Sequence, residues 1–190
     1  MNPRFLLLLE FILLCVALPT VIIVFRLAPL MFFFLWAAAA YCFLIYRRRF
    51  FTGWRDLWRW EEVNRRNLGT ILLRWLVCCV LMTAFLAFYD PGRLFGLAQA
   101  RPEFLLMLFM IYPVLSALPQ EFIFCTFFFD RYKSFFGACR AMMIASAVVF
   151  AYAHVLYINP VAPVLGFFGG LIFAGTYART RSLALVSIEH

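Results

Sequence analysis

The chain has 190 residues, of which 66% are hydrophobic and 14% are charged, and its formal net charge is +8. Its mean hydropathy is +0.93, and its apolar share far exceeds the roughly 45–50% of an average soluble domain. A soluble domain could not bury that much apolar surface, so the composition predicts an integral membrane protein. The positive charge does not indicate nucleic acid, because the arginines gather in one loop, as the positive-inside rule describes.

Apolar runs long enough for membrane-spanning helices follow one another along the chain. They occupy residues 5–25, 28–46, 71–88, 103–129, 141–158, 160–178 and 182 to the end. A span needs roughly 20 residues, so the fold class predicted is all-α, a polytopic transmembrane helical bundle of about seven spans. We treat residues 1–190 as one transmembrane domain. The low charge and short loops are typical of a bacterial protein, so we expect a multi-pass protein of the inner (cell) membrane.

An arginine-rich loop, "RRRFFTGWRDLWRWEEVNRRNLG" at residues 47–69, separates the second and third runs. This density of arginine marks the cytoplasmic side, so the amino terminus is predicted to be cytoplasmic as well. Trp54, Leu57 and Trp58 share one helical face, which favours a short helix lying on the inner leaflet. An ordinary solvated loop is the alternative.

Pro119 lies inside the fourth run, directly before Gln120 and Glu121. Proline removes a backbone N–H and usually kinks or restarts a helix. We therefore expect a kink or a helix start within residues 115–120, with Gln120 and Glu121 in the first turn after it.

Small residues recur at four-residue spacing in the sixth run, at Gly166, Gly170 and Ala174. Small residues in register let helix backbones approach closely. This stripe therefore predicts tight packing against a neighbouring helix.

Ionisable residues at membrane depth are rare and usually face a bundle interior. Glu10 is interpreted as structural, whereas Glu121, His154 and His190 lie on three different segments near mid-membrane. We expect their side chains to converge in one cavity, with Glu121 near His154 and His190 less well placed. A glutamate with two histidines can act as a general base on water, and the same trio could hold a metal ion such as zinc. The residues alone leave hydrolysis, proton or ion transport and buried structural polarity open.

Three blocks carry a family resemblance: "QEFIFCTFFF", "FAYAH" and "FFGGLIFAGTYARTRSLALVSIEH". They resemble the signature blocks of the CAAX-protease and bacteriocin-processing (CPBP, or abortive-infection) intramembrane proteases. That pattern is a Glu-Glu pair followed by an arginine, then Phe-x-x-x-His, then a glycine-rich helix leading to a second histidine. The family-like core spans about 103–190. Phe150 and His154 fit the second block, and His190 fits the last.

The resemblance implies an intramembrane endopeptidase (a hydrolase) that cleaves a membrane-associated peptide within the lipid bilayer, with no nucleic-acid partner. It assigns Glu121, His154, His190 and Gln120 to the catalytic site, with the glutamate and first histidine polarising a water and the second histidine stabilising the oxyanion. We favour a metal-independent mechanism, although zinc could bind Glu121, His154 and His190.

The sequence departs from the family pattern at three places. Gln120 stands at the family's first glutamate, Cys125 stands at the family's arginine, and the chain stops at His190 where the family continues to a further polar residue. We therefore expect the last span to be truncated. The alternative function is a non-catalytic relative that binds a peptide or lipid-linked partner, in an immunity or scaffold role. An ion transporter would need a polar path, for which the sequence offers few residues.

Overall fold

A computed structural model of the chain describes residues 3–137 and 140–190, and all regular elements in these ranges are helices. In this part of the chain, six helical segments are long and apolar enough to cross a membrane. They are Arg4–Val24, Ala28–Arg49, Arg65–Tyr89, Pro102–Arg131, Arg140–Tyr157 and Val161–Thr180. The predicted all-α polytopic bundle is confirmed, and the last apolar run forms only the short helix α13 (Leu183–Glu189).

The spans contain α-helices that are joined by short 3₁₀-helical turns, which are wound more tightly, or π-helical turns, which are wound more widely. The α-helices are α1 (Pro3–Ile12), α2 (Leu18–Val24), α3 (Met31–Arg49), α4 (Trp54–Trp58), α5 (Arg65–Tyr89), α6 (Gly96–Ala100), α7 (Pro102–Tyr112), α8 (Leu118–Glu121), α9 (Phe128–Arg131), α10 (Lys133–Phe136), α11 (Arg140–Ala153), α12 (Val161–Thr180) and α13. Within the described ranges, π-helical turns cover Leu13–Ala17, Pro113–Ala117 and Phe122–Phe127, and 3₁₀ turns cover Ala28–Leu30, Trp60–Glu62, Pro91–Arg93 and His154–Tyr157.

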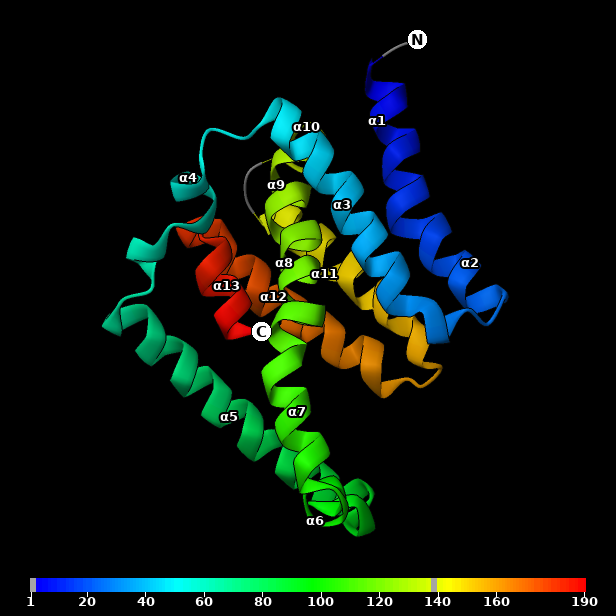
Figure 1. Cartoon of the computed structure of the whole chain (residues 1–190), viewed down its shortest axis with the longest axis vertical. Helices are drawn as coiled ribbons and strands as arrows, with labels where there is room; N and C mark the ends of the chain where they lie inside the picture. Colours follow the sequence, from blue (N-terminus) through cyan, green and yellow to red (C-terminus); the bar gives the residue numbers. More distant parts are fainter. Residues whose placement is uncertain (1–2, 138–139) are drawn as a thin grey trace.

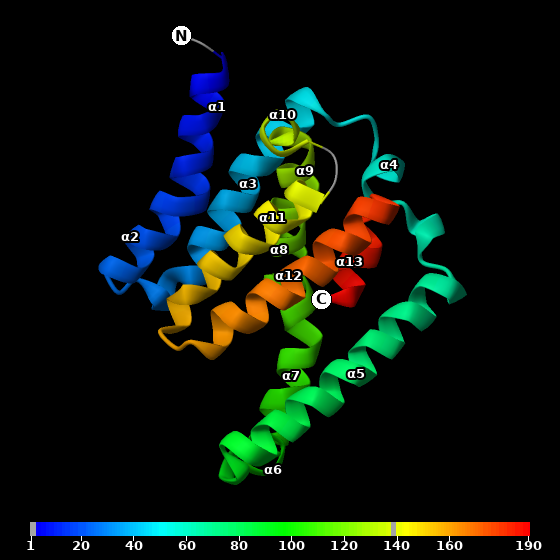
Figure 2. The ribbon, with the colours of Figure 1, turned by 180° about the vertical axis from the view of Figure 1, so that it is seen from behind.

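Most of the spans gather around the fourth one, and α5 stands apart from them (Figures 1 and 2). The centre of the bundle is aromatic, with Phe127, Phe128 and Tyr132 each 1% exposed. Phe11 of α1 meets Tyr132 edge to face at a centroid distance of 5.2 Å. In lipid, such helix contacts depend on close packing, because the surrounding solvent is as apolar as the core.

Contacts between distant segments place the basic loops at one end of the bundle. Arg59 Nη1 donates to the carbonyl of Thr180 at 3.3 Å, and Ser182 Oγ donates to the carbonyl of Trp58 at 2.8 Å. Arg181 forms an ion pair with Asp130 at the same end. The arginine-rich loop, the end of the fourth span and the end of α12 therefore lie together.

The predicted surface helix of the arginine-rich loop forms as α4, but it does not simply lie flat on a membrane. Leu57 is 4% exposed and belongs to the hydrophobic core, whereas Trp54 is 55% exposed. Trp58 also packs against this core. The loop is therefore anchored to the bundle by two side chains, Leu57 and Trp58, of the face that the sequence predicted to meet lipid.

Glu10 is paired within the bundle, in agreement with its structural interpretation. Both of its carboxylate oxygens accept from Arg131, from Nε and Nη2, at 2.7 Å each. A two-point arginine–carboxylate pair fixes orientation as well as distance. This contact therefore ties α1 to α9.

The kink or helix start predicted within residues 115–120 takes the form of a change in winding: α8 begins at Leu118, directly after the π-helical turn Pro113–Ala117, and holds Gln120 and Glu121. The backbone keeps right-handed helical dihedrals at Ala117 and Leu118, and the N–H of Leu118 reaches five residues back to the carbonyl of Pro113. Proline cannot donate to the carbonyl four residues earlier, and that carbonyl, of Leu115, accepts instead from Trp36 Nε1 at 3.0 Å. Local π-helical winding and a neighbouring indole thus replace a helix break.

The small-residue stripe of α12 packs closely on α11. Gly166, Gly170 and Ala174 are all buried. A Cβ added at Gly170 would lie 3.0 Å from the Cα of Ala147, which is closer than most real Cβ contacts, so the backbone of α11 would have to give way slightly. The predicted packing role of this stripe is confirmed.

We expect Gly170→Ala to lower the free energy of unfolding by about 1–3 kcal/mol relative to Gly169→Ala. Both changes add the same helix propensity, but a Cβ at Gly169 meets only the ring of Phe173 at 3.4 Å. Equilibrium unfolding of the two purified variants in the same lipid or detergent measures the difference. Equal stability of the variants would contradict the close backbone contact.

The arginine distribution predicts a cytoplasmic location for residues 47–69. Reporter fusions in cells, one at residue 60 and one at residue 96, provide the measurement. We expect a cytoplasmic signal at residue 60 and an external one at residue 96. The opposite pattern would reverse the orientation of every span.

Candidate functional site

Glu121 is the most deeply buried carboxylate of the polar centre, with 1% of its surface exposed. It ends α8, a four-residue segment between two π-helical turns. Such turns change which side chains of a helix face the interior and are frequent at functional sites. Glu121 Oε1 lies 2.6 Å from His190 Nδ1, and Glu121 Oε2 accepts from Cys125 Sγ at 3.2 Å.

His190 is brought to Glu121 by the sharp turn between α12 and α13. Arg181 adopts a left-handed backbone conformation with φ of 55°. Ser182 Oγ then caps α13 by accepting from the N–H of Leu185 at 3.0 Å. The imidazole stacks on Phe173 with ring centroids 4.6 Å apart, and its Nε2 lies 3.2 Å from the hydroxyl of Tyr112. Both ring nitrogens therefore have polar neighbours.

Gln120 and His154 line a different cavity, of about 120 Å³, on the side of α2 and α3. Gln120 Nε2 donates to Ser116 Oγ at 2.7 Å, and His154 Nδ1 donates to the carbonyl of Phe150 at 2.8 Å. The latter bond leaves His154 Nε2 as the acceptor nitrogen of a neutral ring. The cavity walls are otherwise mainly apolar.

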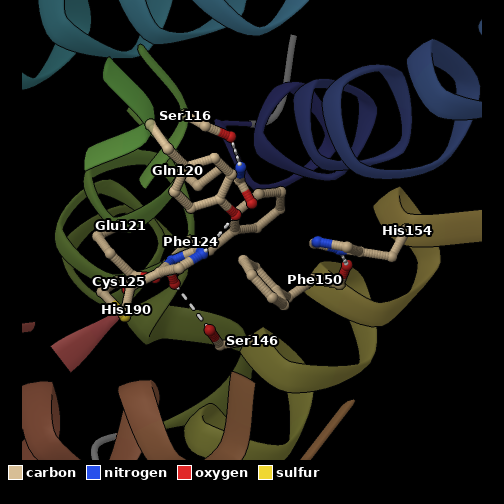
Figure 3. Close-up of polar contacts among 10 residues, drawn as sticks. Ser116, Gln120, Glu121, Phe124, Cys125, Ser146, Phe150, His154 and His190 are labelled. Atoms are coloured by element: carbon tan, nitrogen blue, oxygen red, sulfur yellow. Dashed lines mark hydrogen bonds and ion pairs between the residues drawn. The ribbon is translucent and has the colours of Figure 1, made fainter. Parts of the chain in front are cut away.

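Phe150 separates the two polar groups (Figure 3). Its ring centroid lies 4.5 Å from that of His154 and 5.8 Å from that of His190. The predicted convergence is thus met by Glu121 and His190 but not by His154, which makes no hydrogen bond with either among the described residues. The expectation that His190 would be the less well placed histidine is wrong, because the turn at Arg181 and Ser182 positions it directly.

A second ion pair lies beside this centre and was missed by the sequence reasoning. Arg74 Nη1 donates to Glu189 Oε1 at 2.8 Å and to Thr176 Oγ1 at 3.0 Å. Both charged residues meet the criterion that singled out Glu121, an ionisable side chain in an apolar run. Applying that criterion to every run would have identified them.

An open groove of about 1110 Å³ runs between α5, α7 and α13. Glu189, His190 and Tyr112 line it among mainly apolar side chains. Trp58, Trp60 and Arg65 line it as well, on or beside the arginine-rich loop. Glu121 lies behind His190 and does not line the groove.

The residues proposed for zinc do not form a metal site. Residues 3–137 and 140–190 bring no three His, Cys, Asp or Glu side chains together in a way that could hold a metal ion. His154 is separated from Glu121 and His190 by the ring of Phe150, so the trio lacks its third ligand.

Residues 102–190 match the family described as Type II CAAX prenyl endopeptidase Rce1-like. This match confirms the resemblance to the CAAX-type intramembrane proteases over that segment, and at the level of the family it indicates a membrane protease. Searches of curated proteins and of solved structures found no match.

Proposed function

We propose, from the match to the CAAX prenyl endopeptidase family over residues 102–190, that this protein is an intramembrane endopeptidase that uses the Glu121–His190 pair. The observation that carries the proposal is the contact of 2.6 Å between His190 Nδ1 and Glu121 Oε1. A buried carboxylate bonded to one nitrogen of an imidazole orients the ring and supports a proton on it. The other nitrogen is then available as a general base.

In this mechanism His190 Nε2 takes a proton from a water in the groove while that water attacks the peptide carbonyl. Glu121 stabilises the imidazolium that forms, and His190 then returns the proton to the leaving amine. The assignment differs from the role that the family resemblance gave Glu121, because this carboxylate lies behind the histidine and does not face the groove.

Tyr112 is the proposed donor to the oxyanion. Its hydroxyl lies 3.2 Å from His190 Nε2 and lines the same groove. A donor aimed at the place where negative charge develops lowers the barrier of acyl transfer. Cys125 donates to the other carboxylate oxygen of Glu121, so it helps hold that carboxylate although it replaces the family's arginine.

The proposed substrate is a membrane-associated peptide that enters the groove from the bilayer. The groove is lined mainly by apolar side chains between the first part of α5 and the end of α7, which suits a peptide segment that is dissolved in lipid. Arg65 and two tryptophans line it beside the arginine-rich loop, where the headgroups of the inner leaflet of a bacterial cell membrane would lie.

A non-catalytic binding protein is the second candidate, and one observation favours it. Gln120 holds the position of the family's first glutamate and shares a cavity with His154, so this cavity lacks a carboxylate among its lining residues. Hydrogen-bond groups in an otherwise apolar cavity suit recognition of a lipid or peptide group. In this reading the binding function depends on Gln120 and His154.

Glu121→Ala and His190→Ala should each reduce the rate of peptide cleavage by roughly 10²-fold or more, because each removes a group of the proton-transfer pair. Purified protein in liposomes, incubated with a library of membrane peptides and analysed by mass spectrometry, measures the rate. Circular dichroism confirms that each variant keeps its helices. Full activity in either variant would rule out the proposed pair.

His154→Ala separates the two candidate functions. If the Glu121–His190 pair performs hydrolysis, we expect cleavage by this variant to stay within about threefold of wild type, since His154 contacts neither residue. Loss of cleavage in His154→Ala, with cleavage retained in His190→Ala, would move the reactive centre to the cavity of Gln120. Absence of cleavage by the wild-type protein, together with peptide binding that His154→Ala abolishes, would support the binding protein.

A further inference from the structure

Arg74 lies well inside the apolar stretch of α5, and its charge is accommodated by two residues of other helices. Its Nη1 donates to Glu189 Oε1 of α13 at 2.8 Å and to Thr176 Oγ1 of α12 at 3.0 Å. The side chain of Glu189 is 4% exposed and that of Arg74 is 35% exposed. An arginine at this depth is costly unless it faces such partners.

These bonds are the polar connection between α5 and the bundle. None of the residues of α5 is buried, and the groove separates its first part, from Arg65 to Trp75, from α7. In Figures 1 and 2, α5 lies to one side of α12 and comes closest to α7 near α6. Among the described hydrogen bonds and ion pairs, those of Arg74 alone join the membrane part of α5 to α12 and α13.

Glu189 directly precedes His190, so the position of its carboxylate affects the imidazole. Glu189 Oε2 is buried without a hydrogen-bond partner among the described residues, so the pairing of this carboxylate depends on Arg74 at Oε1. Removing one partner of a buried ion pair leaves an uncompensated charge and is strongly destabilising. Without Arg74, the end of α13 would carry an unpaired carboxylate beside the Glu121–His190 contact.

We propose that Arg74 is a positioning residue: through its ion pair with Glu189 it fixes the end of α13 and holds His190 against Glu121. Only the kinetic consequence of this inference rests on the proposed hydrolytic function; the positioning of His190 does not. It couples the exposed helix α5, one wall of the groove, to the reactive pair at the edge of that groove.

Nitrogen NMR of the histidines tests the positioning without any substrate. His154 and His190 are the two histidines of the sequence, so the full chain in nanodiscs, labelled with ¹⁵N-histidine, gives signals that a His154→Gln variant assigns. In Arg74→Gln we expect the His190 signals to move toward those of a free imidazole while those of His154 stay in place. Arg74→Lys keeps the charge and should stay close to wild type.

Arg66→Gln is the matched control, because Arg66 lies in the first turn of the same helix and has no ion pair among the described residues. This variant should leave both histidines unchanged. Identical His190 signals in Arg74→Gln and wild type, or equal shifts in Arg66→Gln, would overturn the proposal.

Cleavage kinetics supply the second readout. Arg74→Gln should lower kcat by roughly tenfold or more, with KM within about threefold, because displacement of a reacting group by about 1 Å is costly. The double variant Arg74→Gln with Glu189→Gln should show no larger a decrease in kcat than Arg74→Gln alone. Additive losses would show that Arg74 does not act through Glu189. If wild type cleaves no peptide while Arg74→Gln still moves the His190 signals, the positioning role stands and the hydrolytic function fails.

Discussion

Ionised side chains in the hydrocarbon of a bilayer need partners within the protein, because lipid offers none. Three carboxylates of this chain meet that constraint, and each joins segments that are distant in sequence. Glu10 pairs with Arg131, Glu121 contacts His190, and Glu189 pairs with Arg74. The contacts fasten α1 to α9, α8 to α13, and α13 to α5. The arrangement of the reactive pair thus depends on the same requirement that connects the helices.

The fourth span shows how a helix can present polar groups in two different directions without breaking. Gln120 and Glu121 are consecutive, so they point about 100° apart, and π-helical turns lie on both sides of them. One side chain faces the cavity near α2 and α3, and the other faces His190. The repeated "ALP" at residues 17–19 and 117–119 begins on the last residue of a π-helical turn in both spans, so Pro19 and Pro119 both lie just after altered winding.

The spans, their order and the packing of Gly170 could be predicted because they depend on apolar length and on small residues in register. The contact of Glu121 with His190 could also be anticipated, because a polar side chain at membrane depth is stabilised by a polar partner within the protein. The position of His154 could not, because the aromatic ring of Phe150 separates it from that contact, and sequence spacing does not show which side of a helix faces which cavity. The π-helical winding before Pro119 could not be predicted either, nor could the bond from Trp36 to the carbonyl of Leu115, because that bond depends on where α3 lies against the fourth span. Arg74 and Glu189 were visible in the sequence, but their pairing required knowledge of where α5 lies.

The length of α5 has a consequence for the membrane around it. Its 25 residues span roughly 37 Å at 1.5 Å per residue, which exceeds the hydrocarbon thickness of about 30 Å. Such a helix relieves the mismatch by tilting. In Figure 2, α5 and α7 meet near α6 and diverge toward the start of α5, which is the end that lines the groove. The tilt of α5, and with it the width of the groove, should therefore depend on bilayer thickness. A thick bilayer favours an upright α5, and a thin bilayer favours an α5 that is tilted away from α7.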